Sequence, residues 1–283
     1  MTSLEVIRDE IARVTGSRPT GDPEPVGGGC IHNAFVLGDY FLKTNRPSFL
    51  EMFEAEADGL RAIRATGTIR APEPVIAGAG ESAAFLAMER MDLGGRGDEG
   101  ALGEQIAALH RCTDAAHGWE RDNFIGSTPQ PNQPCGDWAE FFRDRRLGHM
   151  LDLLSDRGID FSGSKRFLER VPDLLGGGAA APPSLLHGDL WGGNAGFLSD
   201  GTPVVFDPAV YRGHREADLA MTTLFGGFGP RFYDAYNAAW PPEPGHEERR
   251  GLYNLYHILN HALLFGGGYA SQAAGIIRRY ARA

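Results

Sequence analysis

Two carboxylates and an amide follow two neighbouring apolar runs of the chain. Asp189 and Asn194 stand in LLHGDLWGGNAGF (185–197), where an apolar run enters a glycine-rich loop. Asp207 comes thirteen residues after Asn194, at the end of the apolar run VVF. Magnesium takes a few hard oxygen ligands from a protein, and a separate carboxylate can accept the proton of an attacking hydroxyl. These residues therefore predict a magnesium–triphosphate site with a catalytic carboxylate.

The spacing within this set sharpens the prediction. Asp189 and Asn194 are five residues apart, like the aspartate and asparagine of the protein-kinase loop H-R-D-x-x-x-x-N, and a further aspartate follows in both. The alternative is an Asp/Asn turn beside glycines, because both side chains hydrogen-bond to nearby backbone in loops. The combination with Asp207 favours phosphoryl transfer.

A kinase of this type also needs a strand lysine that pairs with a helix glutamate. Lys43 ends the apolar run YFLK and is one of only two lysines in the chain. The predicted helix 50–66 follows, and Glu56 lies at the edge of its apolar face, whereas Glu54 has a more polar setting. We therefore expect Glu56 to be the partner of Lys43. A surface lysine at a strand end is the alternative.

A triple glycine precedes the predicted hairpin 34–43. Gly27, Gly28, Gly29 and Cys30 could form a loop whose backbone amides approach phosphate oxygens closely. The stretch matches neither G-x-G-x-x-G nor the P-loop pattern, and a flexible turn is the alternative. Cys30 could be a redox-sensitive thiol or simply a small loop residue.

Two histidines stand four residues apart in the predicted helix 246–265. His257 and His261 could ligate a metal, but no third ligand with matching spacing accompanies them. Packed or hydrogen-bonded histidines are the favoured interpretation. The chain also lacks G-x-S-x-G and H-E-x-x-H, so the serine-hydrolase and zinc-protease hypotheses lack their residues.

The elements that must position these residues fall into two parts. Residues 1–92 are predicted to be a strand-rich lobe, and residues 93–283 a larger, mainly helical lobe. The first lobe is predicted to contain helices at 3–15 and 50–66, the hairpin at 34–43, and strands at 74–78 and 83–91. The second is predicted to contain helices at 138–154, 216–226, 230–239, 246–265 and 270–281.

Composition excludes several classes of protein. The 283 residues, 42% hydrophobic and 23% charged, predict a globular chain of about two domains. The net charge of -10 disfavours a general nucleic-acid binder. Three cysteines without paired spacing disfavour a disulfide scaffold and a zinc site. With no signal peptide and no run of 18 apolar residues, a cytoplasmic protein without a membrane partner is expected.

Several motifs resemble the fructosamine kinase (ketosamine-3-kinase) family over about residues 25–270. They include GGGCI (27–31), HGDLWGGN (187–194) and DPAVYRGHREADLAM (207–221). The resemblance implies an α+β, protein-kinase-like two-lobed fold, with a small antiparallel-sheet N-lobe containing one key helix and a larger, mainly helical C-lobe. It also implies ATP- and magnesium-dependent phosphorylation of ketosamines at the sugar O3. The sugar would be fructose, ribulose or erythrulose, on a free amine or on protein.

The resemblance also assigns roles to individual residues. Asp189 matches the catalytic base, Asn194 and Asp207 match magnesium ligands, and Lys43 with Glu56 matches the pair that orients ATP. One departure is Gly192, where many relatives have serine. Further expected residues are Gly27, Gly28, Gly29 and Cys30 over the phosphates, Met88, Glu89 and Met91 at the adenine hinge, Trp191 and His214 at the acceptor, and His187 and Asp218 as support for the catalytic loop.

Other functions remain open at this point. A kinase of the same fold could act on a small amino alcohol or an aminoglycoside, although Trp191 and the GHREADLAM block favour ketosamines. A nucleotide-binding protein without catalysis is a second alternative. The five positions that a kinase needs for its chemistry are all filled, which argues against it: Lys43, Glu56, Asp189, Asn194 and Asp207. Trp191 itself could be a packed loop tryptophan. A monomer or weak homodimer without a nucleic-acid partner is expected.

Overall fold

The computed structural model describes residues 3–27, 31–226 and 228–282 and divides into two compact units. Unit 1 consists of residues 1–98 together with 194–208. Unit 2 consists of residues 99–193 and 209–283. Gly28, Gly29 and Cys30, which were expected to cover phosphates, lie outside the described residues. Among the described residues, no helix is long and apolar enough to cross a membrane.

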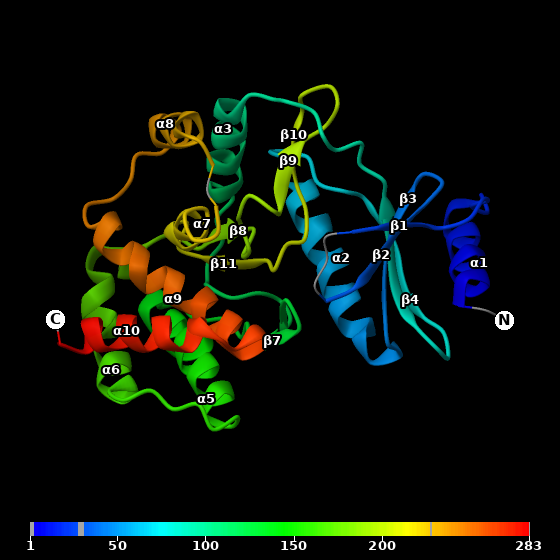
Figure 1. Cartoon of the computed structure of the whole chain (residues 1–283). Helices are drawn as coiled ribbons and strands as arrows, with labels where there is room; N and C mark the ends of the chain where they lie inside the picture. Colours follow the sequence, from blue (N-terminus) through cyan, green and yellow to red (C-terminus); the bar gives the residue numbers. More distant parts are fainter. Residues whose placement is uncertain (1–2, 28–30, 227, 283) are drawn as a thin grey trace. The chain divides into compact units, whose positions relative to one another are not determined.

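Unit 1 is built on a five-stranded antiparallel sheet with the strand order β1-β2-β3-β5-β4 (Figure 1). The predicted hairpin turns at Gly38, whose φ of 59° is easily reached by a residue without a Cβ. The strands are β1 (Glu24–Val26), β2 (Asn33–Leu37), β3 (Tyr40–Asn45), β4 (Pro74–Ala79) and β5 (Ala84–Glu89).

Helices α1 (Ser3–Thr15) and α2 (Leu50–Ala65) cover opposite faces of this sheet (Figure 1). Leu42 of β3 packs in a buried cluster with Ile7 and Ile11 of α1. Successive strand residues point to opposite faces, so Lys43 must face the other helix, α2. The apolar repeat of α2 buries Phe53 and its neighbours against the same side. The alternation of β3 thus places Leu42 on the α1 side of the sheet and Lys43 on the α2 side.

A two-stranded hairpin from later in the chain also belongs to unit 1. It is formed by β9 (Ala195–Phe197) and β10 (Pro203–Val205). Backbone hydrogen bonds of 3.0 Å join the Val205 amide to the Arg70 carbonyl and the Ser199 amide to the Asp92 carbonyl. The sequence analysis had placed this segment in the second lobe and ended the first lobe at residue 92. Long-range pairing of this kind has no local sequence signal.

Unit 2 is mainly helical and packs around one large apolar core. Its core contains Trp138, Phe142, Phe167, Tyr253 and Leu259, all nearly or fully buried. Its helices are α3 (Glu99–His110), α4 (Trp138–Phe141), α5 (His149–Ser155), α6 (Ser164–Leu175), α7 (Glu216–Met221), α8 (Pro230–Ala239), α9 (His246–Phe265) and α10 (Gly268–Arg282). Unit 2 also has a π-helical stretch at Phe142–Gly148 and a 3₁₀ turn at Gly176–Ala180. A further 3₁₀ turn, Pro47–Phe49, belongs to unit 1. The short strands of unit 2 are β6 (Asn123–Ile125), β7 (Thr128–Gln130), β8 (Ser184–Leu186) and β11 (Tyr211–Gly213).

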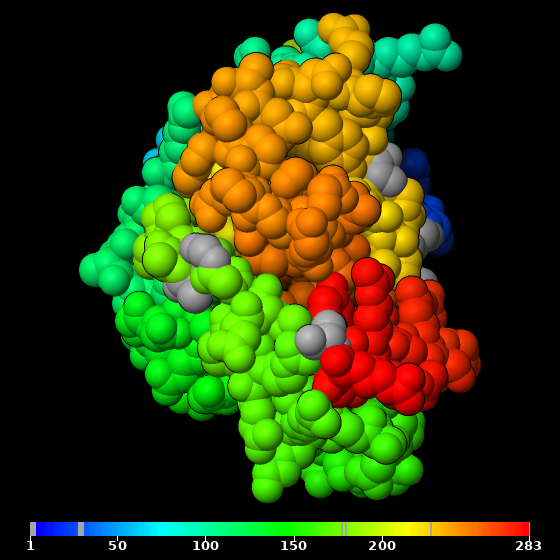
Figure 2. Space-filling view, turned by 90° about the vertical axis from the view of Figure 1, so that its left-hand side faces the viewer, coloured from blue at the N-terminus to red at the C-terminus, as the bar shows by residue number. Residues whose placement is uncertain are grey.

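The C-terminal helices close this core from outside. Figure 2 shows α10, in red, lying against the orange surface of α9 and the green segment that contains α6. Tyr280 of α10 donates a hydrogen bond to the carbonyl oxygen of Glu248 in α9, and Arg170 of α6 donates one to the carbonyl oxygen of Tyr280. The helices predicted at 3–15, 230–239 and 246–265 are observed with those bounds. The helix predicted at 138–154 is interrupted by the π-helical stretch.

Two helix glycines in unit 2 give opposite predictions for substitution by alanine. A Cβ at Gly103 of α3 would overlap the carbonyl oxygen of Phe232 in α8, whereas a Cβ at Gly275 of α10 would meet nothing within 4 Å. We expect Gly103→Ala to lower the free energy of unfolding by about 1–3 kcal/mol. Gly275→Ala should raise it by about 0.5–1 kcal/mol, because alanine favours helices more than glycine does. Urea denaturation of both variants checks this; stabilisation by Gly103→Ala would contradict the described α3–α8 packing.

Candidate active site

Unit 1 holds Lys43 between two carboxylates. Nζ of Lys43 lies 2.7 Å from Oε1 of Glu56 and 2.6 Å from Oδ1 of Asp207. Lys43 is buried and the Glu56 side chain is only 11% exposed, while the Asp207 side chain is 45% exposed. The geometry brings together three residues that are far apart in the sequence. It also places Glu56, and not Glu54, against the lysine.

The charges of this trio determine its protonation. Burial by itself would lower the pKa of Lys43, but the carboxylates of Asp207 and Glu56 outweigh burial and raise that pKa. Burial raises the pKa of Glu56, and Lys43 only partly offsets this. Lys43 is therefore an ammonium ion at neutral pH, and it can attract the oxygens of a phosphate.

Asn194 and Asp207 stand at the same end of the β9–β10 hairpin. Ala195 pairs with Val205, and the amide of Phe206 donates a 3.0 Å hydrogen bond to the carbonyl oxygen of Asn194. Asp207 has a φ of 57°, in the left-handed region that aspartate adopts more readily than most residues. A partly exposed carboxylate and an asparagine at the same end of a hairpin are residue types that fit magnesium.

The residues expected at an adenine hinge lie at the end of β5. Met88 is buried, and the Glu89 amide donates a 2.8 Å hydrogen bond to the Glu73 carbonyl. The Glu89 side chain forms an ion pair with Arg70, so a base could meet only backbone groups of this residue, and of these the amide is already bonded to Glu73. Met91 follows at the half-buried edge of unit 1. Gly27 is exposed before the part of the loop that the structure leaves undescribed.

In unit 2, a buried carboxylate holds the loop that carries Asp189. Asp218 of α7 accepts hydrogen bonds from the amides of His187, at 2.7 Å, and Gly188, at 2.9 Å. His110 of α3 contacts the same carboxylate at 3.1 Å. Burial would raise the pKa of Asp218, but the hydrogen bonds from His110 and the Gly188 amide lower it overall. The loop backbone is thereby fixed just before Asp189.

The shape of this loop requires glycine at position 188. Gly188 has a φ of 83°, and a Cβ there would overlap the carbonyl oxygen of Ala209. His187 is fully buried, and its Nδ1 accepts a 3.3 Å hydrogen bond from the amide of Asp189. The Asp189 side chain remains 24% exposed. A fixed backbone with an accessible carboxylate is the arrangement that a catalytic base needs.

Trp191 begins a row of aromatic rings in unit 2. Its ring lies over Gly193, where a Cβ would overlap it, and contacts Phe225 edge to face at 6.4 Å. The row continues through His261, 4.3 Å from the Phe225 ring, to Tyr269 and Phe265, and Phe265 is 52% exposed. Of this row, only Trp191 was predicted from the sequence as a residue near the acceptor.

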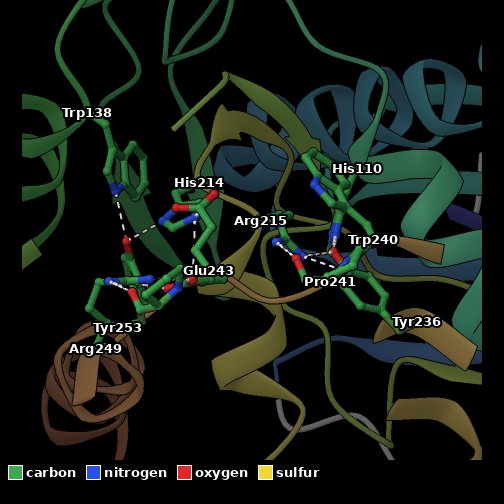
Figure 3. Close-up of polar contacts among 12 residues, drawn as sticks. His110, Trp138, His214, Arg215, Tyr236, Trp240, Pro241, Glu243, Arg249 and Tyr253 are labelled. Carbon is green, nitrogen blue, oxygen red and sulfur yellow. Dashed lines mark hydrogen bonds and ion pairs between the residues drawn. The ribbon is translucent and has the colours of Figure 1, made fainter. Parts of the chain in front are cut away.

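His214, expected at the acceptor, is fully buried in a polar cluster. Figure 3 shows its side chain pointing toward the Tyr253 hydroxyl, at 2.7 Å from Nδ1, and Trp138 donates to the same hydroxyl at 3.1 Å. Nε2 of His214 lies 3.8 Å from Glu216 and 3.7 Å from Glu243. This burial separates His214 from solvent and indicates a supporting position.

The cluster around His214 is the one group of metal-ligand type among the described residues. Arg249 of α9 donates two 2.7 Å hydrogen bonds to Glu216, which therefore already has a cationic partner (Figure 3). A metal ion would be repelled by this guanidinium. The chemistry of the cluster consequently indicates an ion-pair network rather than a metal site.

Arg215 and Asp218, which flank Glu216, connect this segment to other helices of unit 2. Arg215 donates hydrogen bonds to the carbonyl oxygens of Trp240 and Pro241 after α8 (Figure 3). His110, which braces Asp218, also contacts the Tyr236 hydroxyl at 2.8 Å. His110 and Arg249 were missed in the sequence analysis, because their partners are more than thirty residues distant. The segment 214–218 thus connects α3, the end of α8 and α9 to the loop that carries Asp189.

Comparison with known proteins finds relatives that match almost the full length of this chain. A family profile of fructosamine kinases matches residues 3–283. A probable ketoamine kinase from Synechocystis sp. is 44% identical over 94% of each chain. A chloroplastic protein-ribulosamine 3-kinase from Oryza sativa is 44% identical over 91% of this chain and 78% of its own length.

Solved structures agree with this comparison. A provisionally named fructosamine-3-kinase from Haemophilus somnus superposes with a TM-score of 0.91 at 30% identity, over 97% of this chain and 96% of its own. The aminoglycoside phosphotransferase APH(4)-Ia has a TM-score of 0.61 at 15% identity, over 99% of each chain, which bears on the fold alone. The predicted α+β, kinase-like fold is confirmed.

The support of the catalytic loop can be tested through Asp218. Asp218→Asn removes the buried charge and presents an amide group to the N–H donors, so we expect a loss of about 3–5 kcal/mol in the free energy of unfolding. Because the native pKa of Asp218 is lowered, its charge stabilises the fold fully above the ordinary value of 3.8. That contribution disappears as the pH falls through the native pKa, so the gap to wild type should narrow below about pH 4.

Urea denaturation across pH measures this gap. The matched control is Asp144→Asn, since Asp144 also has a lowered pKa, through a hydrogen bond from Arg143, but is exposed. Its effect should stay below about 1 kcal/mol. An Asp218→Asn effect as small as that of the control would contradict the bracing role.

Proposed function

Because this chain belongs to the fructosamine kinase family, we propose that it transfers the γ-phosphate of ATP to the O3 hydroxyl of a ketosamine. The observation that carries this proposal is the buried Lys43, held by Glu56 and Asp207. A lysine between a helix glutamate and a metal-binding aspartate is the arrangement that positions triphosphates in kinases. The names of relatives, which include a ribulosamine 3-kinase, support the choice of acceptor.

The residues of unit 1 bind and orient the nucleotide in this proposal. Lys43 pairs with phosphate oxygens, and Glu56 keeps its ammonium group in place. Asn194 and Asp207 would hold magnesium, which when bound would neutralise charge on the phosphates. Met88, Glu89 and Met91 supply the adenine hinge, Glu89 through its backbone. Gly27, Gly28, Gly29 and Cys30 remain the proposed cover of the phosphates.

The residues of unit 2 act on the acceptor. The carboxylate of Asp189 accepts the proton of the O3 hydroxyl while that oxygen forms its bond to the γ-phosphorus. The bond between the γ-phosphorus and the β,γ-bridging oxygen breaks, and ADP leaves. His187 and Asp218 hold the loop, and His214 supports it from its buried position rather than touching the acceptor.

The aromatic row offers a surface for the acceptor. Trp191 lies two residues after the proposed base, so its ring can border the sugar and exclude water. Phe225 and His261 extend the row, and the rings can attract the cationic amine of a ketosamine. The net charge of -10 also suits a cationic acceptor better than an acidic one.

Steady-state assays with alternative acceptors test the proposal. ADP release should depend on magnesium and on ribulose-lysine or fructose-lysine, at kcat/KM values at least about tenfold above those for choline or kanamycin. A higher kcat/KM for choline or kanamycin would show that the acceptor is not a ketosamine. Nucleotide binding without turnover of any acceptor would indicate a non-catalytic protein.

Two aspartate variants should separate the base from the metal ligand. Asp189→Asn removes the proton acceptor, so kcat should fall by about 10²–10⁴-fold while the Kd for ATP changes less than about threefold. Asp207→Asn should abolish turnover and also remove the gain in ATP affinity that magnesium brings. Single-turnover assays and calorimetric titration with ATP measure both quantities. A collapse of ATP affinity in Asp189→Asn would contradict this division.

Trp191 should contribute to binding of the acceptor. Trp191→Ala removes a ring surface, and we expect KM for ribulose-lysine to rise about tenfold, which corresponds to an aromatic contact of about 1.4 kcal/mol. KM for ATP should change less than about twofold, and the melting temperature should change little. If Trp191 is only a packed loop residue, the melting temperature falls and both KM values change together.

A further inference from the structure

His257 of α9 carries a buried nitrogen without a hydrogen-bond partner among the described residues. The residue is 4% exposed, and the unpartnered atom is Nδ1. A buried polar atom that makes no hydrogen bond costs about 1–3 kcal/mol, so such an atom calls for an explanation. Packing alone does not require a histidine here, because leucines and tyrosines fill the neighbouring positions of α9.

The unpartnered nitrogen lies near the proposed base. Nδ1 of His257 is 3.9 Å from Oδ1 of Asp189. This separation is too long for a hydrogen bond, but closing it by about 1 Å would form one. Hydrogen bonds of catalytic groups are often long without substrate and shorten when substrate binds. A carboxylate only accepts, so the imidazole must be the donor.

The surroundings of His257 keep its ring neutral. Burial lowers the pKa of His257 to about 3, and the neighbouring His261 and Arg146 lower it as well, while Asp218 acts in the opposite direction. A neutral imidazole carries one N–H, and a nearby carboxylate favours the tautomer with the proton on Nδ1. His257 can therefore donate to Asp189 without adding a positive charge that would weaken the base.

We propose that His257 is a positioning residue, which donates a hydrogen bond from Nδ1–H to Oδ1 of Asp189, while Oδ2 takes the proton of the acceptor hydroxyl. This inference rests on the proposed function, in which Asp189 is the base. The hydrogen bond orients the carboxylate, and because it favours the ionised form it also keeps Asp189 deprotonated. It affects kcat and not the binding of either substrate.

Two polar variants test whether Nδ1 or Nε2 of His257 is the donor that Asp189 needs. His257→Asn places an amide N–H close to the position of Nδ1, whereas His257→Gln places it close to that of Nε2. We expect Asn to keep kcat within about threefold of wild type and Gln to lower it about tenfold, with both KM values within about twofold. In the Gln variant the acid limb of the kcat–pH profile should move up by about one unit, since Asp189 loses a donor.

His117→Gln is the matched control. His117 is also buried, also has an unpartnered Nδ1 and also has a pKa lowered by burial, to about 4, but it packs on Trp138. It should leave kcat and the pH profile unchanged. Equal kcat in the two His257 variants, an unshifted profile in His257→Gln, or an equal loss in the control overturns the inference. Wild type without ketosamine-dependent turnover refutes the proposed function instead, and this inference with it.

Discussion

The buried charge of Asp218 is the constraint on which unit 2 depends. A carboxylate removed from water is stable only when donors surround it. Its donors are the amides of His187 and Gly188 and the imidazole of His110, so the bonds that stabilise the charge also hold the backbone before Asp189. The same segment anchors α9 through the pair of Glu216 and Arg249. Stability and the placement of the proposed base therefore have one physical origin.

Unit 1 uses a buried charge of opposite sign. Lys43 stays protonated because Asp207 and Glu56 outweigh the cost of its burial. Glu56 comes from the helix that packs on the sheet, and Asp207 from a hairpin that joins unit 1 from much later in the chain. Both elements must be in place before the charge of the Lys43 ammonium is balanced by its two carboxylate partners. In each unit, buried charges thus fix the positions of the candidate site residues.

Local sequence patterns predicted many of the helices and strands and several site residues. Contacts between segments far apart in the sequence were harder to predict. The position of Lys43 at the end of an apolar run and the apolar face of helix 50–66 were enough to single out Glu56, which the structure places 2.7 Å from the lysine. The joining of the hairpin 194–208 to unit 1 was not predictable, because no local signal marks the partner of a strand. Phe225 and its ring neighbours were missed because residues that are distant in the sequence form these contacts. His214 was expected at the acceptor, but its partners, which include Tyr253, bury it.

The proposed function requires transfer of phosphate to the O3 hydroxyl of a ketosamine. Correlated ³¹P–¹H NMR of the product formed from ATP and ribulose-lysine identifies the phosphorylated oxygen. We expect the phosphorus of the sugar product to couple to the proton on C3 of the ribulose moiety, with one ADP formed for each product. A phosphate on any other oxygen, or ATP consumed only to free phosphate, would refute the transfer to O3.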